Sequence, residues 1–267
     1  MAKDSFSLCV HNHAFEQDFE NTAKSIRQML KTLSKQGLHL DQCLFALEHT
    51  GLYSYEIMKV LSGQKLAYTV IPGLALKKSL GISRGKDDQI DARRIAQYAY
   101  LRQEQLKLHQ LPSQALLCLK NLLSLRAKHV RTRAGYITRV NEQKRILKRK
   151  ENGLLFHSQE KLIKLLNKEI QRVEKEIEKL INDNEQIKYY YNLMSSIKGV
   201  GMIVAAMIIV KTNCFSSFSN WRKFACYIGT APFPNRSGRM EKKNRISMYG
   251  DKEMKTLMTL AAQSAIM

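Results

Sequence analysis

Residues 42–48, Gln-Cys-Leu-Phe-Ala-Leu-Glu, decide how the first 110 residues fold. The segment is apolar on both faces, which is typical of a central strand that is buried from two sides. It ends at Glu48, and Thr50-Gly51 then turns the chain. A carboxylate at the end of a buried strand is costly unless a cation or hydrogen bonds compensate it. Glu48 is therefore a candidate functional residue.

Further strands and several helices are predicted on either side of this strand in the sequence. The spacing of apolar residues predicts further strands over 5–11 and 65–71, with a weaker hairpin partner around Phe15 and Phe19. Helices are predicted over three segments: 21–36, 53–62 and 87–103. A basic loop joins the strand at 65–71 to the last of these helices. Strands that alternate with helices indicate an α/β domain, which ends near residue 110.

A second acidic segment, Lys-Asp-Asp-Gln-Ile-Asp-Ala at 86–92, opens the helix predicted over 87–103. Asp88 and Asp91 are three residues apart and so share one helix face. Helix capping is the simpler explanation for such a pair in isolation. Together with Glu48 the pair favours a site for Mg²⁺, which prefers carboxylate oxygens and supports phosphodiester chemistry. Asp87 is expected to be a bystander on the solvent side.

The charge balance identifies the class of partner. Lys and Arg number 44 against 23 Asp and Glu, which gives a net charge of +21 and a pI near 9.8. Nucleic acid is the default partner of so basic a chain, and an anionic membrane surface is the weaker alternative.

Five dispersed cysteines without a C-x-x-C pair favour neither a zinc knuckle nor a disulfide framework and fit the cytoplasm. We expect no signal peptide, and the longest apolar stretch, 200–210, covers only about half of a membrane span.

Beyond Pro112 the periodicity becomes that of long helices. Apolar residues follow a 3-4 spacing from Leu116 to Leu147 and again from Ile163 to Tyr191, with Asn184 as the polar residue of the second seam. This pattern predicts a coiled coil or a long antiparallel helical hairpin over 111–192, turning at 151–160. Asn184 would then set the register or the number of partners.

The first of these helices is unusually basic. Residues 120–150 contain eleven Lys or Arg and a single acid, Glu142. Such a face is either solvated or in contact with phosphates, and the one-sided balance favours phosphates. Arg126 and Arg133 are candidate nucleic-acid-binding residues on this helix.

The remainder, 193–267, is expected to be a small all-α domain. Helices are predicted over 200–211 and 217–228 and from about 250, with a loop at 229–245. The sequence stops inside its last helix, so we expect a truncated domain. In Ile197-Lys-Gly-Val-Gly201 the Gly199 and Gly201 backbone offers N–H groups to a phosphate, as helix-hairpin-helix modules do, or makes a plain tight turn. The sequence leaves these two alternatives equal.

Ser237 lies in the loop predicted over 229–245. A lone loop serine is usually a turn residue. Its basic neighbours would neutralise a phosphate next to the hydroxyl; they are Arg236, Arg239, Lys242, Lys243 and Arg245. A serine nucleophile needs an activating group, which must come from elsewhere in the fold because no histidine lies nearby in the sequence.

Four blocks in this order carry a family resemblance. Leu47-Glu-His-Thr-Gly51 resembles a Glu-Thr-Thr-Gly block, and Lys86–Ala92 resembles Lys-Thr-Asp-x-x-Asp-Ala. Ile197–Gly201 resembles Ile-Pro-Gly-Ile-Gly, and the stretch from Phe218 through Gly229-Thr-Ala-Pro232 to Ser237-Gly238 resembles Tyr-x-Gly-Leu-Ala-Pro…Ser-Gly. These are the blocks of the DEDD-type transposases of the insertion sequence 110/116/902 family, which includes the Piv DNA invertases.

The resemblance implies an RNase H-like, RuvC-like domain over 1–110, a coiled coil for assembly over 111–192, and a C-terminal transposase domain over 193–267. It implies that Glu48, Asp88 and Asp91 bind Mg²⁺. It implies that Ser237 attacks a DNA phosphate and holds it as a phosphoserine link. The implied partners are double-stranded DNA and further copies of the chain, as a dimer or tetramer, with no membrane. Some members of the family also use a guide RNA from the element.

One departure from the family pattern bears on activity. The family's first acid lies on an opening strand with a pattern like Ile-Asp-Val-Ser-Lys-Asp, and Met1-Ala-Lys-Asp4 aligns with the tail of that pattern. The strand and its acid are therefore expected to precede residue 1, which leaves a metal site short of one ligand and weak or absent cleavage. Three functions stay open: an active transposase or invertase, a truncated non-catalytic DNA- or RNA-binding remnant, and a RuvC-like nuclease that uses water alone.

Overall fold

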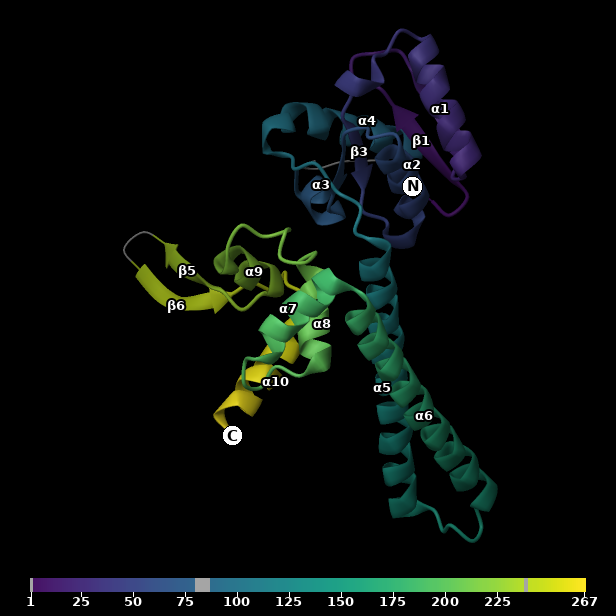
Figure 1. The fold of residues 1–267 in the computed structure, drawn as a ribbon, viewed down its shortest axis with the longest axis vertical. Coiled ribbons are helices and arrows are strands. Elements are labelled where there is room, and N and C mark those ends of the chain that lie inside the picture. The colour runs from purple at the N-terminus through teal and green to yellow at the C-terminus, as the bar shows by residue number, and fades with distance from the viewer. Residues whose placement is uncertain (1, 80–86, 238–239) are drawn as a thin grey trace. The chain divides into compact units, whose positions relative to one another are not determined.

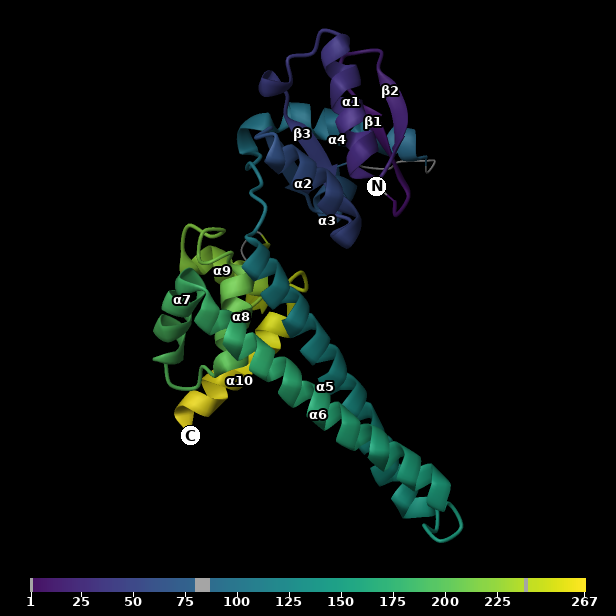
Figure 2. The same ribbon diagram turned by 45° about the vertical axis from the view of Figure 1, so that its right-hand side comes forward.

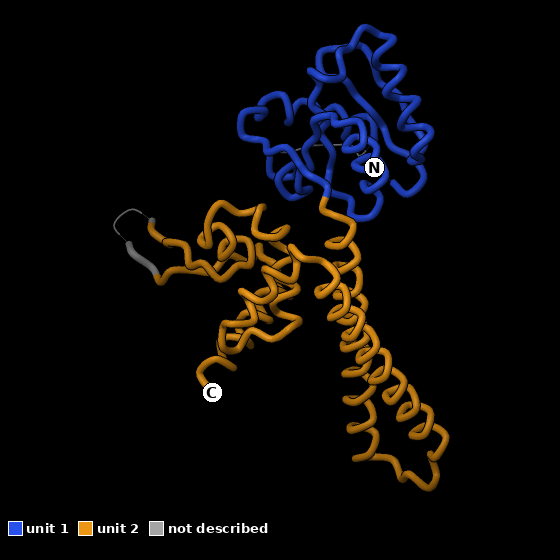
Figure 3. The backbone as a smooth tube through the Cα atoms, in the orientation of Figure 1, with its two compact units in different colours: residues 1–111 blue, residues 112–267 orange. Residues whose placement is uncertain are grey.

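The computed structural model describes residues 2–79, 87–237 and 240–267, with only the backbone described at 237 and 240–242. The chain divides into two compact units, Met1–Leu111 and Pro112–Met267 (Figure 3).

The first unit contains short strands interleaved with helices (Figure 1). Its strands are β1 (Ser5–Cys9), β2 (Glu16–Glu20), β3 (Phe45–Glu48) and β4 (Tyr68–Ile71). Its α-helices are α1 (Ala23–Lys35), α2 (Tyr55–Gly63), α3 (Gly73–Ser79) and α4 (Asp88–Leu101), with 3₁₀ turns at Leu40–Gln42, Gly51–Ser54 and Gln103–Gln105. The predicted strands and helices of this region are thereby confirmed, and α3 is an addition. It was missed because its seven residues contribute a single buried side chain, Leu76.

The strands form two separate pairs. β1 and β2 are antiparallel, with Phe6 opposite Phe19. β3 and β4 are parallel, with Phe45 opposite Tyr68. Successive side chains of a strand point to opposite faces, and here they enter two different cores.

Two hydrophobic clusters cover the two faces of the β3–β4 pair. The larger one joins Phe45, Leu47 and Tyr68 to side chains of β1, β2, α1 and α2, among them Phe6, Phe19, Ile26, Met29, Leu30 and Leu61. The smaller one contains Ile71 with Leu76 of α3 and Ala99 of α4, and Ala46 packs against it. Helices α1 and α2 therefore cover one face of this pair, and α3 and α4 cover the other. This arrangement fits the α/β class predicted for the region, although its strands form two small, separate sheets.

The second unit is mainly helical and begins with a long helical hairpin. Its α-helices are α5 (Gln114–Ile146), α6 (Gly153–Asp183), α7 (Glu185–Ser195), α8 (Met202–Lys211), α9 (Trp221–Ile228) and α10 (Lys252–Ile266). Its strands are β5 (Pro232–Ser237) and β6 (Met240–Ile246). Helices α5 and α6 lie side by side along most of their length (Figures 1 and 2). Of the two predicted forms of this region, the described chain has the antiparallel hairpin.

Two details of that prediction are wrong. The turn falls at 147–152 instead of 151–160, because α6 already begins at Gly153 and buries Phe156 and Gln159. Asn184 does not lie in a continuous helical seam. It is extended (φ −119°, ψ 111°), and its side-chain oxygen accepts a hydrogen bond from Ile187 N at 3.0 Å. The asparagine therefore ends α6 and caps α7, a role that its short polar side chain favours.

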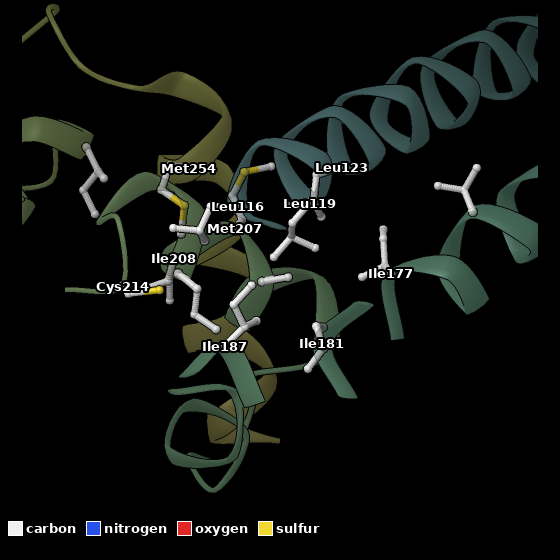
Figure 4. Close-up of a cluster of buried hydrophobic side chains, with 14 residues drawn as sticks. Leu116, Leu119, Leu123, Ile177, Ile181, Ile187, Met207, Ile208, Cys214 and Met254 are labelled. Atoms are coloured by element: carbon white, nitrogen blue, oxygen red, sulfur yellow. The ribbon is translucent and has the colours of Figure 1, made fainter. Parts of the chain in front are cut away.

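The helices of the second unit meet in one buried cluster (Figure 4). It combines side chains from six helices and the loop after α8, among them Leu116, Leu119, Leu123, Ile177, Ile181, Ile187, Met207, Ile208, Cys214, Ile228 and Met254. Helix α8 is apolar on every side and supplies much of this cluster, which explains the long apolar stretch at 200–210. None of the described helices is both long enough and apolar enough to span a membrane.

The C-terminal part is not all-α as predicted. β5 and β6 pair as an antiparallel hairpin where the sequence indicated a loop. The strands were missed because β6 is mainly polar and charged and the flanking Phe233 and Ile246 remain exposed, so the hairpin lacks the apolar alternation of a strand on a core. The helix predicted over 217–228 begins later, at Trp221, where the Asn220 side chain accepts a hydrogen bond from Lys223 N at 3.0 Å.

Candidate functional site

The three carboxylates singled out by the sequence line one cavity in the first unit. The cavity has a volume of about 630 Å³ and lies between β1, β3 and α4. Glu48 reaches it from the end of β3, and Asp88 and Asp91 reach it from the first turn of α4. Strand β3 and helix α4 thus bring Glu48 to the same cavity as two aspartates that follow it by 40 residues or more in the sequence.

Glu48 is held by the geometry of its strand. It is the last residue of β3 and lies beside Ile71 of β4. Alternation directs its side chain to the face opposite Phe45 and Leu47, toward α3 and α4. A Cβ atom added to Gly73 would lie 2.6 Å from Glu48 Oε1, so the carboxylate packs directly against the backbone at the start of α3. A side chain at position 73 would therefore require the Glu48 carboxylate to move.

At the start of α4, one aspartate caps the helix and two others line the cavity. Asp87 is extended, and its side chain accepts a hydrogen bond from Gln89 N at 2.9 Å, so Asp87 is the N-cap. Asp87 is exposed and does not line the cavity, so it lies outside the candidate site on the solvent side, as expected, and its role is to cap α4. Asp88 is exposed, and the half-buried Asp91 forms an ion pair with Arg94, with Oδ1 to Nη1 at 3.0 Å. Because Asp87 caps the helix, capping does not account for Asp88 or Asp91.

The donor atoms suit a divalent cation, since carboxylate oxygens are the preferred ligands of Mg²⁺. The arrangement is more open than a finished metal site. Within 2–79, 87–237 and 240–267, no group of three His, Cys, Asp or Glu side chains lies close enough together to hold an ion. A cation at Glu48, Asp88 and Asp91 would have to draw these side chains together and compete with Arg94 for Asp91.

Sequence reasoning missed Arg94 and Gly73, the two residues that touch the candidate acids. Arg94 had a usable signal, because it follows Asp91 at the i,i+3 spacing that brings helical side chains together. Gly73 had none, because its role depends on a contact between the end of β3 and the first residue of α3.

A half-buried histidine, His109, lies near the same sheet. His109 N donates a hydrogen bond to Tyr68 O at 2.7 Å and so covers part of the outer edge of β4. Burial lowers the pKa of His109, and the charge of nearby His49 lowers it further. The imidazole of His109 is therefore neutral at pH 7.

On α5, the two predicted nucleic-acid-binding arginines contact the partner helix. Arg126 Nε donates to Glu174 Oε1 at 2.7 Å, and Arg133 Nη1 donates to Asn167 Oδ1 at 2.8 Å. Both arginines therefore help to hold α5 against α6, and their binding to nucleic acid stays a prediction. Other basic side chains of α5 are exposed: Lys120, Lys128, Arg131, Arg139 and Arg145.

The glycine-rich turn between α7 and α8 has one glycine in a tight contact. Gly199 has φ +86°, and a Cβ atom there would lie 2.3 Å from the carbonyl oxygen of Ala261 in α10. Packing against α10 therefore accounts for Gly199. Gly201 is the N-cap of α8, and a Cβ atom at this position would meet nothing within 4 Å. The N–H groups that follow Gly201 keep the phosphate-binding alternative open.

Ser237 lies at the end of β5, where its backbone is paired with Met240. Arg236 is on the same strand, and Lys243 and Arg245 are exposed on β6. Arg239 and the side chains of Ser237 and Lys242 lie outside the described part of the chain. The backbone thus places four of the predicted basic residues, Arg236, Lys242, Lys243 and Arg245, on the hairpin that carries Ser237.

Comparison with known proteins agrees with these features. A family model described as a transposase of the DEDD type matches residues 1–150, and a second, described as the transposase IS116/IS110/IS902 family, matches residues 191–267. The pilin gene-inverting proteins of Moraxella lacunata and Moraxella bovis are each 25% identical to the chain over 268 residues, which are 98% of this chain and 80% of each relative. Transposases are DNA-binding, DNA-recombining enzymes, and the DEDD type generally uses divalent metal ions. Because the first model matches more than half of its residues, the chain belongs to the DEDD-type transposases of the IS110/IS116/IS902 family.

Proposed function

We propose that the chain is the transposase or site-specific recombinase of an insertion sequence and that it cleaves and rejoins DNA strands with an acidic metal site and a serine nucleophile. The observation that carries this proposal is the meeting of Glu48, Asp88 and Asp91 at one cavity in a chain of the DEDD family. The net charge of +21 supports a polyanionic substrate.

Glu48, Asp88 and Asp91 would hold Mg²⁺ in a RuvC-like domain over 1–110. The bound ion would stabilise negative charge that develops on the phosphate oxygens during strand exchange. The residues of the chain orient this site: Gly73 leaves room for the Glu48 carboxylate, and Arg94 holds Asp91 until a cation replaces it.

Ser237 is the proposed nucleophile. Its hydroxyl oxygen forms a bond to phosphorus, the bond from phosphorus to one deoxyribose oxygen breaks, and the proton of the serine passes to that leaving oxygen. The resulting phosphoserine link conserves the energy of the phosphodiester, so the strand can be rejoined to another end. Arg236, Arg239, Lys242, Lys243 and Arg245 would neutralise the phosphates on either side.

The other parts of the chain have roles in the same proposal. Residues 111–192 would join copies of the chain into a dimer or tetramer as a coiled coil, and 193–267 would grip double-stranded DNA with the help of Gly199 and Gly201. Arg126 and Arg133, with the exposed basic residues of α5, would contact DNA or a guide RNA from the element. The site of action would be the cytoplasm.

DNA inversion is the second candidate function, because both Moraxella relatives are named as pilin gene-inverting proteins. A transposase and an invertase would use the same residues and differ in the arrangement of the DNA sites. A non-catalytic remnant is the third, and the open arrangement of the three carboxylates motivates it.

The decisive experiment traps the phosphoserine link. The chain and its Ser237→Ala variant are incubated with Mg²⁺ and end-labelled DNA containing the junctions of the element, and the adduct that survives denaturing electrophoresis is measured. Because the first acid of the family pattern has no counterpart in the sequence, we expect at most a weak adduct with the parent chain and a strong one after the opening strand with its acid is restored upstream. The control Ser195→Ala removes a hydroxyl that donates to Asn192 O in its own helix, and it should match the chain in which it is made. We expect none with Ser237→Ala or Glu48→Gln.

Each other result selects a different function. Recombination by Ser237→Ala would refute the serine nucleophile, and cleavage without any adduct would indicate hydrolysis by water. DNA binding without cleavage, in the parent chain and also after the opening strand with its acid is restored upstream, would identify the remnant.

A further inference from the structure

The sequence between Glu185 and Glu241 contains no acidic residue. These 55 residues include seven Lys or Arg and form nearly all of α7 and the whole of α8, α9 and β5. Positive charge without carboxylates of the same segment favours the approach of a polyanion. This part of the second unit is therefore a place to look for contacts with nucleic acid.

The only tryptophan of the chain, Trp221, lies in this segment and is 73% exposed. Tryptophan side chains are highly buried on average. Trp221 is the first residue of α9, which the Asn220 side chain caps. The other rings of this helix are packed: the ring centroid of Phe218 is 5.5 Å from that of Phe224 and 5.2 Å from that of Tyr227. Trp221 is thus an exposed ring on a helix whose other aromatic side chains have partners.

Arg222 lies over the Trp221 ring, with its guanidinium carbon 5.3 Å from the ring centroid. A cation over an indole face is a favourable contact. The ring is nevertheless 73% exposed, so the guanidinium leaves much of it open to solvent. Proteins bind single-stranded nucleic acid with this combination, in which a base stacks on the ring and the cations follow the phosphates.

The surroundings of Trp221 favour nucleic acid over a protein partner. Its neighbours in the sequence are all polar and exposed: Ser219, Asn220, Arg222 and Lys223. The centre of a protein–protein interface is instead apolar and depleted of charge. A scattered exposed apolar side chain needs no partner. Here the ring is joined to a cation within a segment that has no acids, and this combination points to a base next to a phosphate.

We propose that Trp221 and Arg222 form a stacking site for an unpaired base of the DNA strand. The base stacks on the indole, and Arg222 with Lys223 neutralises the adjoining phosphates. The site accepts any of the four bases, because each has a flat π-face. The inference rests on the proposed strand exchange, in which DNA strands must separate near the cleaved phosphate.

The stacking site lies close along the chain to the hairpin that carries Ser237 (Figure 1). Only residues 229–231 join α9 to β5. Gly229 packs closely against Gly250, since a Cβ atom added to Gly250 would lie 2.8 Å from the Cα atom of Gly229. Helix α9 is about 12 Å long and β5 about 20 Å. The path from Trp221 to Ser237 is therefore at most about 40 Å, little more than one turn of B-DNA at about 34 Å.

The test uses the fluorescence of Trp221, which reports on this position alone because the chain has no other tryptophan. The full chain is titrated with single-stranded DNA of about twelve nucleotides. The matched ligand is an abasic strand of the same length, which has the same phosphates and no bases. We expect the strand with bases to quench the fluorescence several-fold more than the abasic strand, because only a base can stack on the indole.

Variants separate the ring from its surroundings. Trp221→Ala should weaken binding of a labelled single strand about tenfold, measured by fluorescence anisotropy, and Trp221→Phe should recover most of that loss because it keeps an aromatic face. Both variants should bind fully paired duplex with the affinity of the parent. The control Tyr189→Ala removes a ring that is 61% exposed on α7 and should change neither affinity. Since Trp221 lies outside the core, the urea midpoint of Trp221→Ala should equal that of the parent.

These measurements need neither Mg²⁺ nor cleavage. Ser237→Ala should bind the single strand like the parent, so the outcome for the stacking site is independent of the nucleophile.

Four results would overturn the proposal. Equal quenching by the abasic strand would show that phosphates alone are bound near the ring. An unchanged single-strand affinity of Trp221→Ala would exclude the ring from binding, and an equal loss with duplex would place the ring on paired DNA. A single-stranded RNA of the same sequence that quenches the tryptophan where DNA does not would assign the site to RNA.

Discussion

Lys211 Nζ lies 2.6 Å from Asp251 Oδ2 and so joins the end of α8 to the start of α10. Asp251 also caps α10, because its Oδ1 accepts a hydrogen bond from Met254 N at 3.0 Å. Burial is the largest single influence on Lys211 and disfavours its charged form, but the hydrogen bond to Asp251 together with the charges of Tyr227, Asp251 and Glu253 outweighs burial and raises the pKa of the lysine. Burial likewise opposes the charged form of Asp251, and the bonds from Lys211 and from Met254 N outweigh it and lower the pKa of the aspartate.

The stabilisation from this pair is greatest at intermediate pH. The contribution of Asp251 is fully present above its unfolded pKa of 3.8 and is lost as the pH falls through its lower folded value. The contribution of Lys211 is fully present below 10.5 and is lost as the pH rises through its higher folded value. Lys211→Met should cost about 1.5–3 kcal/mol of unfolding free energy at pH 7 and progressively less in acid. Urea unfolding from pH 2 to pH 8 measures this, and a cost that is constant across that range would contradict it.

Two substitutions at one position separate the ion pair of Asp251 from its cap. Asp251→Asn removes the charge but keeps an oxygen that can accept the bond from Met254 N. Asp251→Ala removes both and should be less stable than the asparagine variant by about 1 kcal/mol, the usual value of an N-cap. Equal stabilities in urea unfolding at pH 7 would show that the hydrogen bond from Met254 contributes nothing.

Arg94 should compete with metal ions for Asp91. Its guanidinium is 3.0 Å from Asp91 Oδ1, so a cation must displace it to bind that oxygen. Arg94→Gln should therefore tighten Mg²⁺ binding several-fold, measured by calorimetric titration of the full chain. Arg102→Gln, at the other end of α4, serves as the matched control and should leave the affinity unchanged. Weaker Mg²⁺ binding by Arg94→Gln would show instead that Arg94 positions Asp91 for the ion.

Much of the first unit could be predicted from periodicity, because its strands and helices carry regular apolar patterns. The apolar run that ends at Glu48 forms the predicted strand, but only the face of Phe45 and Leu47 is buried, whereas Ala46 and Glu48 on the other face are half-buried and line the cavity. The helix that carries Asp88 and Asp91 starts where predicted. Their common cavity also follows from these elements, since the end of a strand and the start of the helix packed on it lie close together. The sequence does not show that Asp87 caps the helix instead of Asp88, because the two aspartates are adjacent and either one suits the N-cap position.

Features that depend on contacts distant in the sequence were missed. Asn184 fits a heptad seam as well as it fits a cap, and only the separate packing of α7 decides between them. The β5–β6 hairpin buries little apolar surface, so its sequence lacks the alternation that reveals strands on a core. The positions of Gly73 and Gly199 against other elements have no local signal at all.

Gly199 and Gly201 should respond very differently to alanine. Gly199 has φ +86°, and its added Cβ would lie 2.3 Å from Ala261 O, a backbone atom that cannot move aside cheaply. Gly199→Ala should cost at least about 2–3 kcal/mol through strain and overpacking. Gly201→Ala has space for its Cβ and should cost less than about 1 kcal/mol. Thermal unfolding followed by circular dichroism compares the two variants, and similar losses for both would contradict the close packing of Gly199 on α10.

Basic residues on the two faces of α5 should have separable effects. Lys128 and Arg139 are exposed and lie three helical turns apart on one face, whereas Arg126 is half-buried against Glu174. Replacing Lys128 and Arg139 together by Gln should weaken DNA binding and lower the slope of log affinity against log salt by about 1.8, while stability changes by less than about 0.5 kcal/mol. Arg126→Gln should instead reduce stability by about 0.5–1 kcal/mol with little change in that slope. Fluorescence anisotropy with duplex DNA over a range of salt concentrations, paired with urea unfolding, distinguishes the two. A salt slope that falls for Arg126→Gln and stays constant for the double variant would place the phosphate contacts on the face toward α6.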